Sequence, residues 1–141
     1  MKIIHLTNAY DDFFPEHVYN NWHARIARNM ARYLPKVFDA IEAWSATLKI
    51  RKPLLLIDRY GVIYRVFPAI LKVHYMLVSL KMIKNLLNEL TNEDFLCMHF
   101  VDSITSNLLY ILRLLEKSRK RIKLIIFDHG ISLALNFLIN I

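Results

Sequence analysis

The chain has 141 residues, a formal net charge of +7 and a hydrophobic content of 55%. This length gives room for one domain with a sizeable core but not comfortably for two. Only two glycines occur, Gly61 and Gly130, which argues against a low-complexity chain. No uninterrupted apolar stretch approaches the ~20 residues that span a bilayer. The apolar part of residues 1–8 is too short for a signal peptide and lacks a small-residue cleavage site.

The single cysteine, Cys97, lies in an apolar run. It excludes an internal disulfide and fits a reducing compartment, so we expect a cytoplasmic protein. No basic residue stands beside it to lower the pKa of its thiol. We therefore interpret Cys97 as a buried structural thiol rather than a nucleophile.

The positive charge favours an anionic partner such as a phosphate, a nucleotide, a lipid headgroup or nucleic acid. It is concentrated in two groups. The first lies along a predicted helix and consists of Arg25, Arg28, Arg32 and Lys36. The second is a dense basic cluster late in the chain, formed by Lys117, Arg119, Lys120, Arg121 and Lys123. The late cluster has two interpretations, a helix C-terminus that continues into a solvated loop or a membrane-surface patch.

The first part of the chain predicts a strand, a loop, a helix and a second strand. Residues 2–6 are a short apolar run, and residues 7–17 are a loop. Apolar residues recur at helical spacing from Val18 to Leu34, and Pro35 ends this helix. Residues 37–44 suit the second strand.

The middle of the chain predicts a hairpin and a long helix. Two apolar runs, 54–57 and 62–66, flank a four-residue turn in which Gly61 can take a positive φ. Pro68 then opens a helix that we expect to continue to about Leu90. Its inward face is formed by apolar residues at helical spacing: Val73, Met76, Leu77, Leu80, Ile83, Leu87 and Leu90.

The last part predicts a strand over 95–101, a helix over 104–115 capped by Asp102 or Ser103, and a strand over 122–127. No internal repeat or linker is visible, so residues 1–141 are expected to form one domain. Alternating strands and helices predict an α/β fold with a mainly parallel sheet that is covered by helices on both faces.

A candidate site follows the last predicted strand. Asp128-His129-Gly130 comes directly after the apolar run 124–127, and functional groups in open α/β sheets gather past the carboxyl ends of the strands. The histidines have no metal-binding context of the CxxC or HExxH kind. The chain also lacks a P-loop, a serine hydrolase motif and a GxGxxG motif after the first strand. We expect neither a metal nor a cofactor.

Three stretches together resemble the GT-B glycosyltransferases, specifically their family-4-like N-terminal domain. The opening residues 1–10 look like the first strand of that domain, and the small and basic residues of 24–32 are similar to its first helix. The sharpest match is the pairing of Met98-His99-Phe100-Val101-Asp102-Ser103 with the segment 124–130. In the family, one strand ends in a histidine-containing segment and the next strand ends in His-Gly.

The resemblance implies a Rossmann-like, acceptor-binding half of an enzyme that moves a hexosyl unit from a nucleotide sugar to a saccharide or lipid-linked acceptor. The donor-binding half would be missing, so the chain is expected to be truncated or to need a donor-binding partner chain, and to be inactive alone. His129 would lie near the donor sugar and the reaction centre, and Gly130 would allow close backbone approach. His99 would line the cleft, and the loop that carries Asp12 and His17 would shape the acceptor pocket. The glycine pair that the family has in this loop is absent here.

Each site residue also has an ordinary structural interpretation. His129 can make a backbone hydrogen bond at the end of its strand, His99 can pack or cap, and Asp12 and His17 can be loop or helix-start residues. The competing function is a non-catalytic basic module that docks on a partner protein or on an anionic membrane surface, at the inner face of the membrane. It relies on the basic cluster of 117–123 and the apolar tail of 131–141. Nucleic acid is not an expected partner, because no recognisable binding motif occurs.

Overall fold

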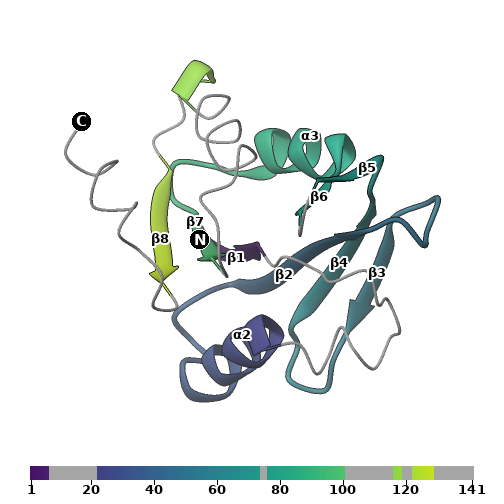
Figure 1. Ribbon diagram of the computed structural model, residues 1–141. Helices are drawn as coiled ribbons and strands as arrows, with labels where there is room; N and C mark the ends of the chain where they lie inside the picture. Colours follow the sequence, from purple (N-terminus) through teal and green to yellow (C-terminus); the bar gives the residue numbers. More distant parts are fainter. Residues whose placement is uncertain (7–21, 74–75, 101–115, 119–121, 129–141) are drawn as a thin grey trace.

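The computed structural model describes residues 1–6, 22–73, 76–100, 116–118 and 122–128. Two named α-helices and eight strands lie in these ranges, and residues 116–117 are also helical (Figure 1). In chain order they are β1 (Lys2–Leu6), α2 (Trp22–Tyr33), β2 (Ala40–Thr47), β3 (Leu54–Ile57), β4 (Ile63–Pro68), β5 (Leu71–Val73), β6 (Met76–Val78), α3 (Leu80–Glu89), β7 (Phe95–Phe100) and β8 (Lys123–Asp128).

The main sheet has six strands in the order β3-β4-β2-β1-β7-β8. All neighbours are parallel except β3 and β4, which form an antiparallel hairpin. The expected α/β class and mainly parallel sheet are therefore confirmed. The parallel pairing of β7 with β8 also agrees with the predicted strands at 95–101 and 122–127.

Strand β1 lies in the centre of the sheet, between β2 and β7. Strands β2 and β4 lie on one side of β1, and β7 and β8, which come later in the chain, lie on the other side. Leu6 stands opposite Trp44 of β2 and Met98 of β7. The five parallel strands therefore end at one edge, called here the carboxyl edge, and begin at the opposite amino edge.

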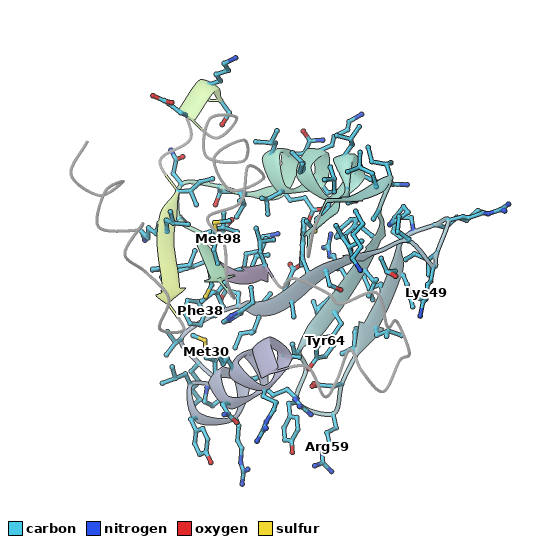
Figure 2. All side chains as sticks on the ribbon, in the orientation of Figure 1. Met30, Phe38, Lys49, Arg59, Tyr64 and Met98 are labelled. Atoms are coloured by element: carbon cyan, nitrogen blue, oxygen red, sulfur yellow. The ribbon has the colours of Figure 1, made fainter. Side chains whose placement is uncertain are left out.

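Two hydrophobic clusters pack against the sheet, and alternate strand residues supply them because successive side chains point to opposite faces. One cluster joins Ile4, Trp44, Phe67 and Met98 to α3 through Ile83 and Leu86. The other joins residues of the opposite parity to α2: Ile3, Ala43, Tyr64 and Cys97 pack with Ala24 and Ala27. Figure 2 shows Met98 on the side of α3, whereas Met30 and Phe38 lie toward α2.

The second strand lies later in the chain than predicted. It spans Ala40–Thr47 instead of 37–44, and Phe38 precedes it and packs edge-on against Phe95. Residues 41–47 are all buried. A central parallel strand is covered on both faces, so hydrophobic alternation is a poor guide to its limits. The predicted first helix ends close to its expected position, and its residues 18–21 lie outside the described ranges.

The predicted helix from Pro68 to Leu90 is wrong over its first half. A small antiparallel hairpin, β5–β6, pairs Leu71 with Val78, and the helix α3 begins only at Leu80. Ser79 explains this start, because its hydroxyl accepts a hydrogen bond from the backbone N–H of Met82 (3.2 Å) in the manner of an N-cap. The expected inward position of Leu80 is also wrong, since this side chain is exposed.

The predicted 54–66 hairpin is confirmed. Asp58 organises its turn: one carboxylate oxygen accepts hydrogen bonds from the backbone N–H groups of Tyr60 and Val62, and the other accepts one from the hydroxyl of Tyr64. Gly61 has φ +79°, as expected. The predicted helix over 104–115 and its caps Asp102 and Ser103 lie outside the described residues.

Candidate functional site

The carboxyl ends of β1 and β7 form the topological switch point of the sheet. From β1 the strand order continues to β2 on one side and to β7 on the other. Connections that leave two such neighbouring strands separate to opposite faces, and this opens a crevice in which α/β proteins commonly bind their ligands. Leu6 and Phe100, the last residues of β1 and β7, therefore mark the candidate site.

The structure brings the ends of the two histidine-containing segments next to each other along the backbone. His99 is the penultimate residue of β7 and stands opposite Phe127 of β8, and Phe100 stands opposite Asp128. His129 follows Asp128 directly in the chain. His129, Gly130, Asp12 and His17 themselves lie outside the described residues, so their assigned roles stay predictions.

The sheet behind this edge is tightly packed. His5 and Cys97 are opposite each other in β1 and β7, and both are completely buried. Burial raises the pKa of the Cys97 thiol to about 12, so the group is protonated at neutral pH. The interpretation of Cys97 as a structural thiol rather than a nucleophile agrees with this environment.

Sequence reasoning missed a network of four alternating charges between the sheet and α3. The carboxylate of Glu42 lies 3.0 Å from Nε of Arg65 and 3.4 Å from Nζ of Lys2. The carboxylate of Glu89, at the end of α3, lies 2.7 Å from an amino nitrogen of Arg65 and 3.5 Å from Nζ of Lys2. Trp44 donates a hydrogen bond from Nε1 to Glu42 (2.7 Å), and its ring lies under the guanidinium of Arg65.

This network is a structural feature rather than a second site. Each carboxylate contacts both cations, so the four formal charges cancel. Glu42 is only 4% exposed, and its carboxylate already has three polar partners. The sequence does contain an indication of this charge network. Glu42 and Arg65 are the single charges of otherwise uncharged strands, and buried charges are normally paired.

The amino edge of the sheet is closed by a second set of polar contacts. Asp94, just before β7, accepts hydrogen bonds from the backbone N–H of Lys2 (2.8 Å) and from both the N–H and the hydroxyl of Thr91 (2.9 Å each). Burial acts to raise the pKa of Asp94, but these hydrogen bonds outweigh it, and the pKa lies below its usual value of 3.8. The terminal amine of Met1 pairs with Asp39 at 2.6 Å.

Three further findings concern metal ligands, membrane-spanning helices and known proteins. Across its described ranges, no three His, Cys, Asp or Glu side chains come together as a set that could hold a metal ion. No helix in those same ranges combines the length and the apolar character needed to cross a membrane. The chain matches no protein-family model, no curated protein and no solved structure.

Proposed function

We propose that this chain is the acceptor-side half of a glycosyltransferase with a GT-B-like architecture. It would bind a saccharide or lipid-linked acceptor at the carboxyl edge, while a donor-binding partner chain or second domain would supply the nucleotide sugar. The observation that supports the proposal best is the strand order, which changes direction at β1 and creates a switch point at Leu6 and Phe100. A Rossmann-like domain with helices on both faces is part of the proposal. Its support is that α2 and α3 pack in different hydrophobic clusters of the sheet.

The proposed roles of the site residues follow from the position of the strand ends. His99 would line the cleft from the end of β7, beside the end of β8. His129 would stand one residue beyond β8, near the transferred sugar, where Gly130 would leave room for the substrate. The loop after β1, which carries Asp12 and His17, would form the other wall of the acceptor pocket.

The test combines turnover with a map of the binding site. The purified chain is incubated with uridine, guanosine and adenosine diphosphate hexoses, and the release of nucleoside diphosphate is followed. We expect no release by the chain alone, and robust turnover would contradict the proposal that a separate donor-binding partner chain or domain is needed. Titration with a panel of mono- and disaccharides, followed by amide NMR, should then shift signals of Leu6 and Phe100 but not of Lys2 or Asp94.

Two variants make the binding test specific. His99→Ala should weaken the binding of any saccharide that shifts the carboxyl-edge signals, whereas Lys84→Ala, an exposed change on α3, should leave it unchanged. Shifts confined to the amino edge, or equal effects of the two variants, would contradict the proposed site.

The second candidate function is the basic module that docks on a membrane or a partner protein. In the described residues of the 117–123 cluster, both Lys117 and Lys123 are exposed, and Lys123 lies over the ring of Phe95. A cytoplasmic location with peripheral binding to the inner membrane face would follow from this function. Vesicle binding that depends on 117–123 and persists in His129→Ala would favour it.

A further inference from the structure

A corner of the carboxyl edge, at the ends of β2 and β4, brings three separate connections together. Thr47 and Pro68 pair at the ends of these strands, and the N–H of Ala69 donates a hydrogen bond to the carbonyl of Thr47 (2.8 Å). The hydroxyl of Ser79 donates one to the carbonyl of Pro68 (2.7 Å). The β2–β3 connection, the start of the β5–β6 hairpin and the start of α3 therefore leave from one place, as Figure 1 shows.

Aliphatic side chains are exposed on all three of these connections. Leu48 follows Thr47, Ile70 and Leu71 follow Ala69, and Leu80 follows Ser79. Each of these four side chains is between 42% and 59% exposed. Single exposed leucines are common on soluble proteins. The hydrogen bonds of Thr47, Pro68 and Ser79 bring these four exposed aliphatic residues to one corner, called here the patch, and exposed apolar groups of this kind mark interaction surfaces.

The patch is also strongly basic. Three of its aliphatic residues are followed directly by an exposed lysine, in the pairs Leu48-Lys49, Leu71-Lys72 and Leu80-Lys81. Arg51 and Lys52 add two exposed cations on the β2–β3 connection. Figure 2 shows Lys49 projecting at this corner, well away from Arg59 in the β3–β4 turn.

Acidic residues are almost absent from the sequence around the patch. From Ala43 to Asn88 the chain has eight Lys or Arg residues and one acid, Asp58. Asp58 is engaged in the β3–β4 turn at the opposite edge, where it holds the hydroxyl of Tyr64. The patch therefore complements a negative surface, and repulsion between like charges disfavours a second copy of the chain as its occupant.

We propose that this corner is a docking surface for an anionic lipid bilayer. Leu48, Ile70, Leu71 and Leu80 would enter the boundary between headgroups and acyl chains, while the neighbouring lysines would reach the lipid phosphates. A single-stranded nucleic acid would need exposed rings for stacking. The aromatic residues of the two strands that end at the patch, Trp44 of β2 and Tyr64 and Phe67 of β4, are buried. The surface shares no residue with the 117–123 cluster or the 131–141 tail, and it does not depend on glycosyl transfer.

The test is co-sedimentation of the purified chain with phosphatidylcholine vesicles, with and without phosphatidylglycerol. Binding should require the anionic lipid. A juxtamembrane cation contributes about a fivefold gain in affinity, so Lys49→Gln/Arg51→Gln/Lys52→Gln should weaken binding by about a hundredfold. The matched charge control is Arg25→Gln/Arg32→Gln/Lys36→Gln on and after α2, which removes three exposed cations and should weaken binding by less than about tenfold.

The aliphatic part of the surface needs its own pair of variants. Ile70→Ser/Leu71→Ser should abolish most vesicle binding at unchanged charge. Leu55→Ser/Ile57→Ser is the matched control, because these residues of the edge strand β3 are 56% and 60% exposed and lie outside the patch. Thermal melting followed by circular dichroism verifies that each variant keeps the fold.

Three results would overturn the proposal. The first is the absence of vesicle binding by the unchanged chain. The second is an equal loss of binding in the patch and α2 charge variants, which would indicate diffuse attraction by the whole molecule. The third is an affinity for heparin or for an acidic protein that equals the affinity for vesicles and does not change in Ile70→Ser/Leu71→Ser. This result would identify a soluble polyanion as the partner.

Discussion

Replacing Arg65 by methionine should be the most destabilising single change to the charge network. Glu42 would lose the cation at 3.0 Å and keep only Lys2 at 3.4 Å and the indole N–H of Trp44. Removing one partner of a fully buried ion pair costs ~3–5 kcal/mol. Because the side chain of Arg65 is 24% exposed and Lys2 remains, we expect the lower end of that range, about 3 kcal/mol.

Two further contacts of Arg65 add to this loss. The ion pair with Glu89, which is partly exposed, contributes about 0.5 kcal/mol, and the contact with the ring of Trp44 contributes a similar amount. The sum of about 4 kcal/mol is a large part of the ~5–15 kcal/mol that stabilises a typical domain. It corresponds to a fall in melting temperature of roughly 14 °C.

The assay is urea unfolding of a double-mutant cycle made of Arg65→Met, Glu42→Gln and their combination. A neutral amide at residue 42 can still accept the hydrogen bond from Trp44, so the double variant should be more stable than the sum of the single losses predicts, by at least ~1 kcal/mol. Arg59→Met is the matched control, because Arg59 is exposed in the β3–β4 turn and should change stability by less than ~0.5 kcal/mol. An Arg65→Met variant as stable as Arg59→Met, or strictly additive effects at 42 and 65, would refute the reasoning.

Three other predictions test the packing and the turns. With a pKa of about 12, Cys97 should not react with Ellman's reagent at neutral pH until the chain is unfolded in guanidinium, and rapid labelling of the folded chain would contradict its burial. Gly61→Ala should lower the free energy of unfolding by ~1–2 kcal/mol through backbone strain alone, since a Cβ at this residue meets no atom within 4 Å; Gly61→Asn should lose less. The pKa of Asp94 is lower in the folded chain, so its carboxylate stabilises the fold above pH 3.8, and this contribution disappears as the pH falls through the folded-state pKa. When the free energy of unfolding is measured as a function of pH, it should therefore fall less steeply below that pH in Asp94→Asn than in the unchanged chain. The same pH dependence in both would show that Asp94 does not contribute.

The limits of a strand could be predicted from the sequence alone where local patterns determine them. Strands β1, β3, β7 and β8 are short apolar runs next to turn residues, and their predicted limits differ from the observed ones by at most one residue at either end. The 69–78 segment was mistaken for helix because a short apolar run satisfies helical and strand patterns equally well. The deciding contacts there are non-local, such as the pairing of Ala69 with Thr47.

The charge network could not be predicted for a related reason. Lys2, Glu42, Arg65 and Glu89 are far apart in the chain, and only the strand order brings them together. Sequence patterns predicted the edge that carries the candidate site but not the exposed patch beside it. The expected long helix placed Leu80 in the core, whereas the N-cap at Ser79 makes Leu80 the first residue of α3, at the exposed corner.

The two edges of the parallel sheet have different chemistry: polar contacts hold the amino edge together, whereas both proposed binding surfaces lie at the carboxyl edge. At the amino edge, Asp94 holds the start of β1, and the ion pairs of Lys2 and Arg65 attach the end of α3 to the strands. Substitutions there should change unfolding without changing ligand binding. At the carboxyl edge, the switch point at Leu6 and Phe100 lies on the same side of the sheet as the basic aliphatic corner at Thr47. A bilayer bound at that corner would lie beside the proposed acceptor crevice, so the two proposals together favour the lipid-linked acceptor over the free saccharide.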